Sequence, residues 1–159
     1  MGEKEFLGQV KQCHGLILKL IGLYAYSLND RNDLYQEILL NAWKGLAGFR
    51  KEAKFSTWLY QVAINTIFTA NRKTRPLSYT DTLEDFIIPV NQQTEQKEDI
   101  QRLYKAIRQL AEVDRIIITM HLEGYDNPEI ADVLGIKANY TGVKLHRIKS
   151  QLQTILTQD

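Results

Sequence analysis

The sequence predicts an all-α protein with two small helical domains joined by a flexible linker, the C-terminal domain being a helix-turn-helix. Apolar residues recur every three or four positions along most of the chain, which is the period of an amphipathic helix. Only three prolines and nine glycines interrupt its 159 residues. Residues 76–98 lack this period and hold two of those prolines with several acids and glutamines, as a linker would. We therefore expect domains at 1–75 and 99–159.

The first domain should be a bundle of three helices. We expect one helix from about Glu5 to Ser27, one that begins after the cap-like Asn29 and Asp30 and stops at the glycines of 45–48, and one from near Ser56 to Pro76. The second domain should begin with two helices, the second of which contains the β-branched run 116–119. The flanks of that run are helical in pattern, so we expect a buried helix there rather than a strand.

The last two expected helices form the helix-turn-helix. Asn127 should cap the first of them, with Pro128 at the first helical position and Glu129 at the positive end of the helix dipole. Gly135 should end it, because a left-handed residue costs glycine least. The second helix, from about Ala138 to Leu156, should bury a stripe spaced by four, three and four residues, namely Thr141, Leu145, Ile148 and Leu152.

The opposite face of this last helix carries amides and cations, which suits the major groove of B-DNA. Arg147 and Lys144 fit guanine edges or phosphates, and Asn139 fits adenine. A solvated amphipathic helix is the alternative interpretation. The residues expected to contact duplex DNA are Lys137, Asn139, Tyr140, Lys144, Arg147 and Lys149.

Charge is distributed unevenly, although the formal net charge is only +1. Segment 51–75 has a net charge of +4, segment 76–99 of −5 and segment 135–159 of +3. Two basic segments separated by an acidic one indicate two anion-binding surfaces with a solvated spacer, and ordinary surface charge is the alternative.

The sequence offers no catalytic or metal-binding pattern, so we predict neither an enzyme nor a cofactor. Cys13 and His14 are adjacent and would point about 100° apart on a helix, which is unsuitable for a catalytic pair. The three histidines lack partners at metal-ligand spacing. A single cysteine fits a reducing compartment, and no apolar run is long enough to span a membrane. We expect a cytoplasmic protein without membrane insertion.

A more specific pattern lies in the first domain. The segment Asp33-Leu34-Tyr35-Gln36-Glu37 leads to Ala42-Trp43, and residues 49–65 read Phe-Arg-Lys-Glu-Ala-Lys-Phe-Ser-Thr-Trp-Leu-Tyr-Gln-Val-Ala-Ile-Asn. Later come Glu129-Ile130-Ala131, Leu134-Gly135-Ile136 and Leu145-His146-Arg147. In this order, the motifs closely resemble those of bacterial RNA polymerase sigma factors of the extracytoplasmic-function group. The resemblance covers nearly the whole chain apart from the linker.

The resemblance implies a role for each segment. One helix should dock on the clamp of core RNA polymerase through Asp33, Gln36, Glu37, Leu40 and Trp43, although Trp43 would also suit the core. The next segment should hold unpaired promoter bases with Arg50, Lys51, Lys54, Ser56, Thr57, Trp58, Tyr60, Gln61 and Asn65, since aromatic and hydrogen-bonding groups stabilise a base outside the stack. Phe55 and Trp58 also fit structural roles. Phosphates of the adjoining duplex should be bound by Arg72, Lys73 and Arg75.

The resemblance thus implies a sigma factor that binds core RNA polymerase and directs promoter recognition, DNA melting and transcription initiation. Its expected partners are core RNA polymerase, promoter DNA and an anti-sigma factor. Gly142 and Val143 depart from the polar or basic residues usual in the family's recognition helix, and Thr141 replaces a usual valine. Two alternatives stay open: a stand-alone helix-turn-helix regulator, and a sigma mimic that sequesters an anti-sigma factor.

Overall fold

The computed structural model describes the chain except for residues 26, 53, 74–93 and 159. Every regular element in the described residues is a helix, which confirms the all-α prediction. The chain divides into two compact units, Met1–Asp85 and Phe86–Asp159, and each has a core of its own. Most of the predicted linker lies outside the described residues.

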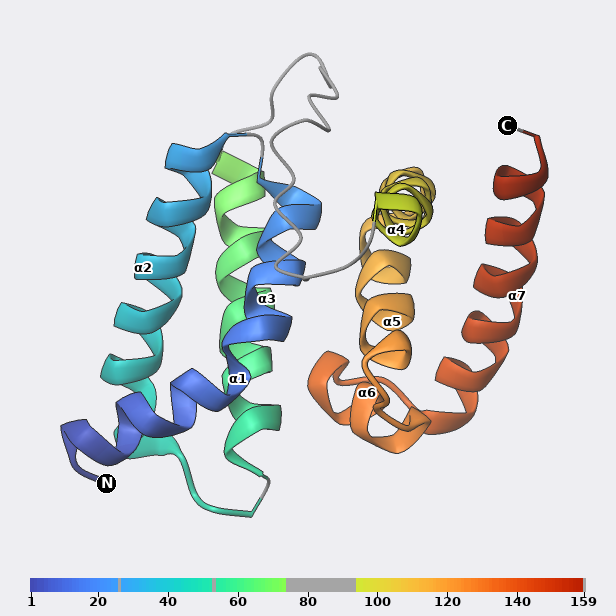
Figure 1. The fold of residues 1–159 in the computed structure, drawn as a ribbon. Helices are drawn as coiled ribbons and strands as arrows, with labels where there is room; N and C mark the ends of the chain where they lie inside the picture. The colour runs from blue at the N-terminus through green and yellow to red at the C-terminus, as the bar shows by residue number, and fades with distance from the viewer. Residues whose placement is uncertain (26, 53, 74–93, 159) are drawn as a thin grey trace. The chain divides into compact units, whose positions relative to one another are not determined.

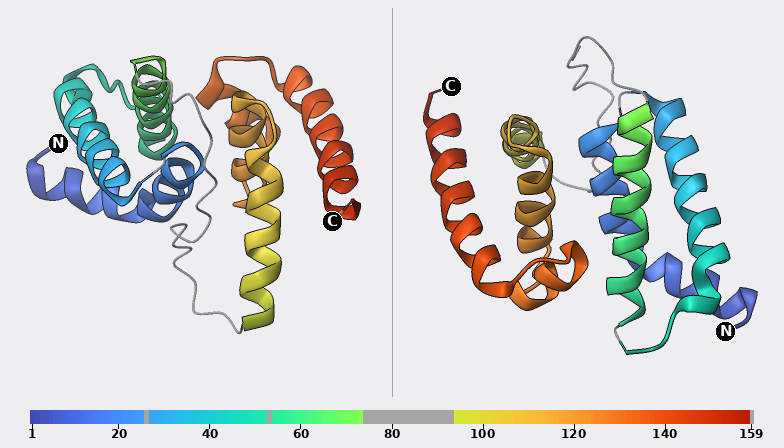
Figure 2. Two further views of the ribbon diagram at one scale, coloured as in Figure 1. Left: turned by 90° about the horizontal axis from the view of Figure 1, so that it is seen from above. Right: turned by 180° about the vertical axis from the view of Figure 1, so that it is seen from behind.

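The first unit is a bundle of three long helices. It consists of α1 (Glu3–Tyr24), α2 (Leu28–Gly45), a short 3₁₀ helix η1 (Leu46–Gly48) and α3 (Phe55–Lys73). Each long helix packs on the other two, and α2 runs beside α3 (Figures 1 and 2). The centre of the bundle is filled by aliphatic side chains that are almost wholly buried, among them Ile17, Leu20, Ile21, Ile38, Leu59 and Ile67.

The start of α2 differs from the sequence-based expectation. The hydroxyl of Ser27 accepts a hydrogen bond from the backbone N–H of Asp30 at 3.1 Å, so Ser27 is the cap. Asn29 and Asp30 therefore lie inside the first turn rather than before it. A serine oxygen satisfies the same free N–H group that an asparagine or aspartate would have satisfied, and Asp30 still complements the helix dipole.

The second unit consists of α4 (Thr94–Arg108), α5 (Glu112–Leu122), α6 (Asn127–Leu134) and α7 (Ala138–Thr157). The helix α7 packs on the other three. The β-branched run 116–119 is buried within α5, as expected. The helix α4 begins at Thr94, inside the segment predicted as linker, since the acids near its start suit the positive end of a helix.

Candidate nucleic-acid interface

The first helix of the helix-turn-helix is fixed at both ends. The Asp126 carboxylate accepts a hydrogen bond from the Glu129 N–H at 2.9 Å, and Glu129 in turn accepts one from the Asp126 N–H at 3.4 Å. This capping box makes Asp126 the cap, so the sequence-based assignment to Asn127 was wrong by one residue. Gly135 ends the helix with a φ of 69°, in the left-handed region, as predicted.

The helix α7 has the two faces that its spacing predicts. Its buried residues are Thr141, Leu145, Ile148 and Leu152. On the outer face, the exposed residues include Lys137, Asn139, Tyr140, Val143, Arg147 and Lys149. The polar and basic groups predicted for DNA contact are therefore accessible, with one exception.

That exception is Lys144. Its ammonium group lies 3.0 Å from Oδ1 of Asp114 on α5 and 5.7 Å from the centre of the Tyr140 ring. The hydrogen bond to Asp114 raises the pKa of Lys144 above its ordinary value. The ion pair therefore joins α7 to α5 in the free chain, and the role of Lys144 in DNA contact stays a prediction.

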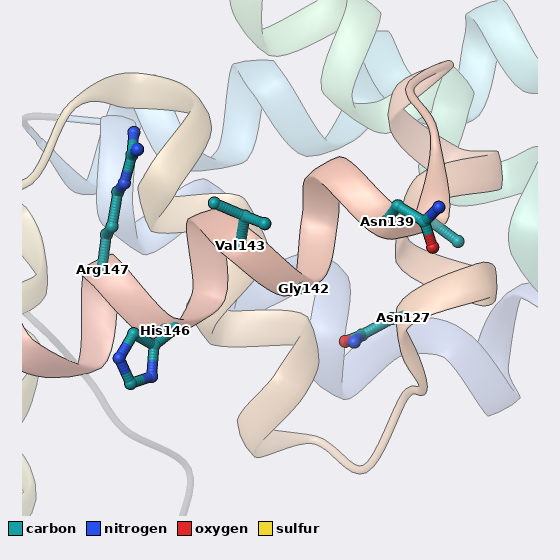
Figure 3. A pocket seen from close by; sticks show the side chains of 7 residues that line it. Asn127, Asn139, Gly142, Val143, His146 and Arg147 are labelled. Carbon is teal, nitrogen blue, oxygen red and sulfur yellow. The ribbon is translucent and has the colours of Figure 1, made fainter.

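An open groove follows the N-terminal half of α7. It is lined by Asn127, Ala138, Asn139, Gly142, Val143, His146 and Arg147 (Figure 3). A Cβ atom at Gly142 would lie only 3.3 Å from Nδ2 of Asn127 at the start of α6. That atom is the far end of a flexible side chain, so the space around residue 142 does not by itself require a glycine, which disfavours a helix interior.

In the first unit, the expected polymerase-binding residues lie on one face of α2. Asp33, Gln36 and Glu37 are exposed. Leu40 and Trp43 are large apolar residues that remain 51% and 45% exposed. The Trp43 ring also meets Phe6 of α1 edge-on, with 5.2 Å between centroids, so it contributes to packing as well as to the surface.

The residues expected to hold unpaired bases divide into accessible and buried groups. Arg50, Lys51, Lys54 and Asn65 are exposed, and Ser56, Trp58 and Gln61 are half-buried. Thr57 and Tyr60, by contrast, are buried, with 8% and 3% exposure. Tyr60 lies against the core and hydrogen-bonds Cys13, whose pKa is raised by burial. These two residues support α3 from within, which corrects their assignment to the DNA-binding set.

Among the predicted phosphate contacts, Arg72 and Lys73 lie in the last turn of α3, and Arg75 is outside the described residues.

A cluster of five aromatic rings anchors the loop between η1 and α3. Phe49 lies 5.7 Å from Phe55 and 5.3 Å from Trp58, and Phe6 joins the cluster 6.1 Å from Phe55 and beside Trp43. The loop turns at Lys51, which has a φ of 57°. Sequence reasoning gave Phe55 and Trp58 structural roles as an alternative, but it missed Phe6, whose partners are far away in the sequence.

No group of three or more His, Cys, Asp or Glu side chains among the described residues could hold a metal ion. His14 Nδ1 lies 2.8 Å from the Tyr35 hydroxyl, which gives that histidine a structural partner. None of the helices in the described ranges is long and apolar enough to cross a membrane.

Two models of one protein family match the chain. Residues 9–76 match sigma-70 region 2, and residues 100–152 match sigma-70 region 4. Among curated relatives, the extracytoplasmic-function (ECF) RNA polymerase sigma factor SigG of Mycobacterium tuberculosis is 29% identical over 81% of this chain. The ECF sigma factor SigM of the same species is 26% identical over 90% of this chain and 72% of its own length. The chain belongs to the ECF sigma factors.

The fold of this ECF sigma factor is also found among solved structures. It superposes on the sigma factor RpoE of Bartonella quintana, solved in complex with the anti-sigma factor NepR, with a TM-score of 0.74. The two sequences are 23% identical, and the match covers 98% of this chain and 99% of that one. The chain spans 42% of the length of SigG, so the likeness to that relative concerns part of it.

The matched regions contain the two surfaces described above. Region 2 includes the exposed face of α2, the aromatic cluster apart from Phe6, and the loop at 50–54. Region 4 includes the helix-turn-helix and the groove along α7.

Proposed function

We propose that this ECF sigma factor binds core RNA polymerase and directs promoter recognition, DNA melting and transcription initiation. The observation that carries the proposal is the presence of two distinct exposed surfaces on two units: an apolar pair on α2, and a polar and basic outer face on α7. A protein that only binds duplex DNA has no need of the first. The polymerase supplies the phosphodiester chemistry, so this chain requires no catalytic residue.

Leu40 and Trp43 are the proposed centre of the polymerase interface. Large apolar groups surrounded by polar ones form the energetic centre of many protein interfaces. On the same face lie Asp33, Gln36 and Glu37, with the exposed Lys44 one turn beyond Leu40, so acidic groups outnumber basic ones. An acidic rim favours a basic partner surface through charge complementarity.

DNA binding is divided between the units. In the first unit, Arg50, Lys51 and Asn65 are accessible for an unpaired strand, and the half-buried Trp58 is an aromatic candidate for stacking against a base. Arg72, Lys73 and Arg75 are proposed to bind phosphates of the adjoining duplex. In the second unit, Asn139 and Arg147 are proposed to read bases in the major groove, while Lys137 and Lys149 bind phosphates.

Further partners follow from the same proposal. Because the template and polymerase of a bacterium are cytoplasmic, the protein is proposed to act there. The solved relative RpoE is held by the anti-sigma factor NepR. We extend this to the present chain by proposing an anti-sigma factor as a third partner.

Reconstitution with core RNA polymerase tests the proposal. The holoenzyme is used to select duplexes from a random pool, and strand opening is followed by permanganate reactivity of unpaired thymines. An Arg50→Ala/Asn65→Ala double variant should bind the selected duplexes normally but open them less. A Lys4→Ala/Lys11→Ala variant, which removes two exposed charges from α1, is the control and should open them normally. Equal loss of duplex binding and strand opening in the first variant would contradict the assignment of Arg50 and Asn65 to single-strand binding.

A stand-alone regulator is the alternative function. It would bind duplex DNA through α7 but form no stoichiometric complex with core polymerase. Co-purification of the chain with core polymerase therefore separates the two functions. A sigma mimic, in turn, would form the complex or capture an anti-sigma factor without supporting promoter-dependent transcripts.

A further inference from the structure

The middle turn of the exposed face of α7 carries an apolar side chain. Val143 is 53% exposed and lines the groove between Asn139 and Arg147, each one helical turn away (Figure 3). A valine is less favourable in a helix than alanine, because its branched side chain loses rotamer freedom. Since this valine is also not part of the core, neither helix formation nor packing accounts for it.

The neighbours of Val143 leave its methyl groups accessible. Gly142 has no side chain, and a Cβ placed there would meet only the side-chain amide of Asn127. The Lys144 ammonium group forms an ion pair with Asp114, and the exposed Tyr140 ring lies beside this ammonium group. The centre of the face is therefore apolar, with an amide on one side and a guanidinium group on the other.

Base edges in the major groove present donors, acceptors and one apolar group, which is the C5 methyl of thymine. An apolar side chain gains contact there with a methyl group and gains nothing from a donor or acceptor. We propose that Val143 recognises a thymine methyl group in the duplex promoter element, between the positions read by Asn139 and Arg147. This inference rests on the proposed function, since it names the base chemistry read by the same helix.

The test removes single methyl groups from the DNA. Duplexes are first selected from a random pool by the holoenzyme, and each thymine of the conserved double-stranded element is then replaced by deoxyuridine. Affinity is measured in closed complexes at low temperature. For the wild-type holoenzyme, one replacement should weaken binding about fourfold, which corresponds to the burial of one methyl-sized group.

Val143→Ser identifies the residue that senses the methyl group. The variant should bind the thymine duplex more weakly than the wild type does. Its affinities for the thymine duplex and the deoxyuridine duplex should be equal. Leu122→Ala is the control, because Leu122 is an exposed apolar residue of the same unit at 50% exposure. It should retain the full deoxyuridine penalty. Melting temperatures of both variants establish that folding is intact.

The outcomes separate this inference from the function on which it rests. If no deoxyuridine replacement weakens binding, or if the penalty persists in Val143→Ser, the methyl contact is overturned while sequence-specific binding stands. If the holoenzyme selects no duplex at all, the proposed function fails, and the inference fails with it.

Discussion

The ammonium group of Lys144 lies 3.0 Å from the Asp114 carboxylate, and this ion pair joins helix α7 to α5. Both side chains are partly shielded, at 27% and 15% exposure. A shielded pair is screened less by salt than a surface pair. The pair therefore constrains the orientation of α7 without placing a charge on its outermost face.

Replacement of Asp114 by asparagine should destabilise the second unit by about 1 kcal/mol, because the Lys144 ammonium group loses its anionic partner and keeps only a hydrogen bond to a neutral amide oxygen. The pKa of Lys144 is raised from its ordinary 10.5, mainly by the hydrogen bond to Asp114. A raised pKa in the folded state stabilises the fold at pH values below the ordinary pKa, and this stabilisation is lost as pH rises through the folded-state pKa. The difference between wild type and variant, measured by urea unfolding, should therefore shrink above pH 10.5.

Replacement of Phe49 by alanine should loosen the loop that carries Arg50 and Lys51. The lost contacts with Phe55 and Trp58 should cost about 1–3 kcal/mol in the stability of the first unit. Phe68→Ala is a matched control, because Phe68 is also half-buried and pairs edge-on with Tyr24. Below the melting temperatures of both variants, permanganate reactivity should fall in Phe49→Ala alone. A similar fall in both would show that only stability had changed.

Replacement of Arg147 by alanine should weaken binding to the selected duplex by about 1–3 kcal/mol if the guanidinium group reads a base, and sequence preference should relax at one position. A phosphate contact would instead weaken all duplexes alike and reduce the dependence on salt. Titrations at several salt concentrations distinguish the two results. Lys105→Ala, which removes an exposed charge from α4, should change neither property.

Replacement of Leu40 by alanine should reduce affinity for core polymerase by about 2 kcal/mol, as expected for an apolar residue at the centre of an interface. Leu40 is 51% exposed, so the melting temperature should hardly change. Leu122→Ala, of similar exposure but in the second unit, is the comparison. Competition binding against the labelled wild type measures both. An unchanged affinity in Leu40→Ala would place the polymerase interface elsewhere.

Replacement of Gly142 by alanine should stabilise the second unit by up to about 1 kcal/mol, because alanine is the better helix former. The new Cβ would meet Asn127 Nδ2, which is the far end of a flexible side chain and is able to rotate away. The Gly142→Ala/Asn127→Ala double variant removes that contact and should show the full gain. A loss of stability in both variants would mean that the α6 backbone itself limits the approach.

The sequence predicted the helices and the buried stripe of α7 because both depend on local periodicity. Spacings of four, three and four fix which side of a helix is apolar, whatever the helix packs against. The family could also be recognised from the sequence, since the residues of each motif are contiguous or nearly so. Those predictions required no knowledge of contacts between helices.

Errors arose where a contact between distant residues decides the outcome. The ion pair of Lys144 could not be predicted, because Asp114 is 30 positions away and only the packing of α7 on α5 brings the two residues together. Tyr60 looked like a base-stacking residue until its burial against Cys13 was known. The predicted cap of α6 was wrong for a different reason. Asp126 and Asn127 are equally good capping residues, and only Asp126 has a glutamate, Glu129, three positions later to complete a capping box.

Because each unit fills its own interior, the two can be recombined genetically. A hybrid protein that keeps Met1–Asp85 and takes its remaining residues from another member of the group needs no repacking within either half. Under the proposed function, such hybrids would bring the same core RNA polymerase to other promoters. New regulons could thus arise by exchange of one half, with the other left as it was.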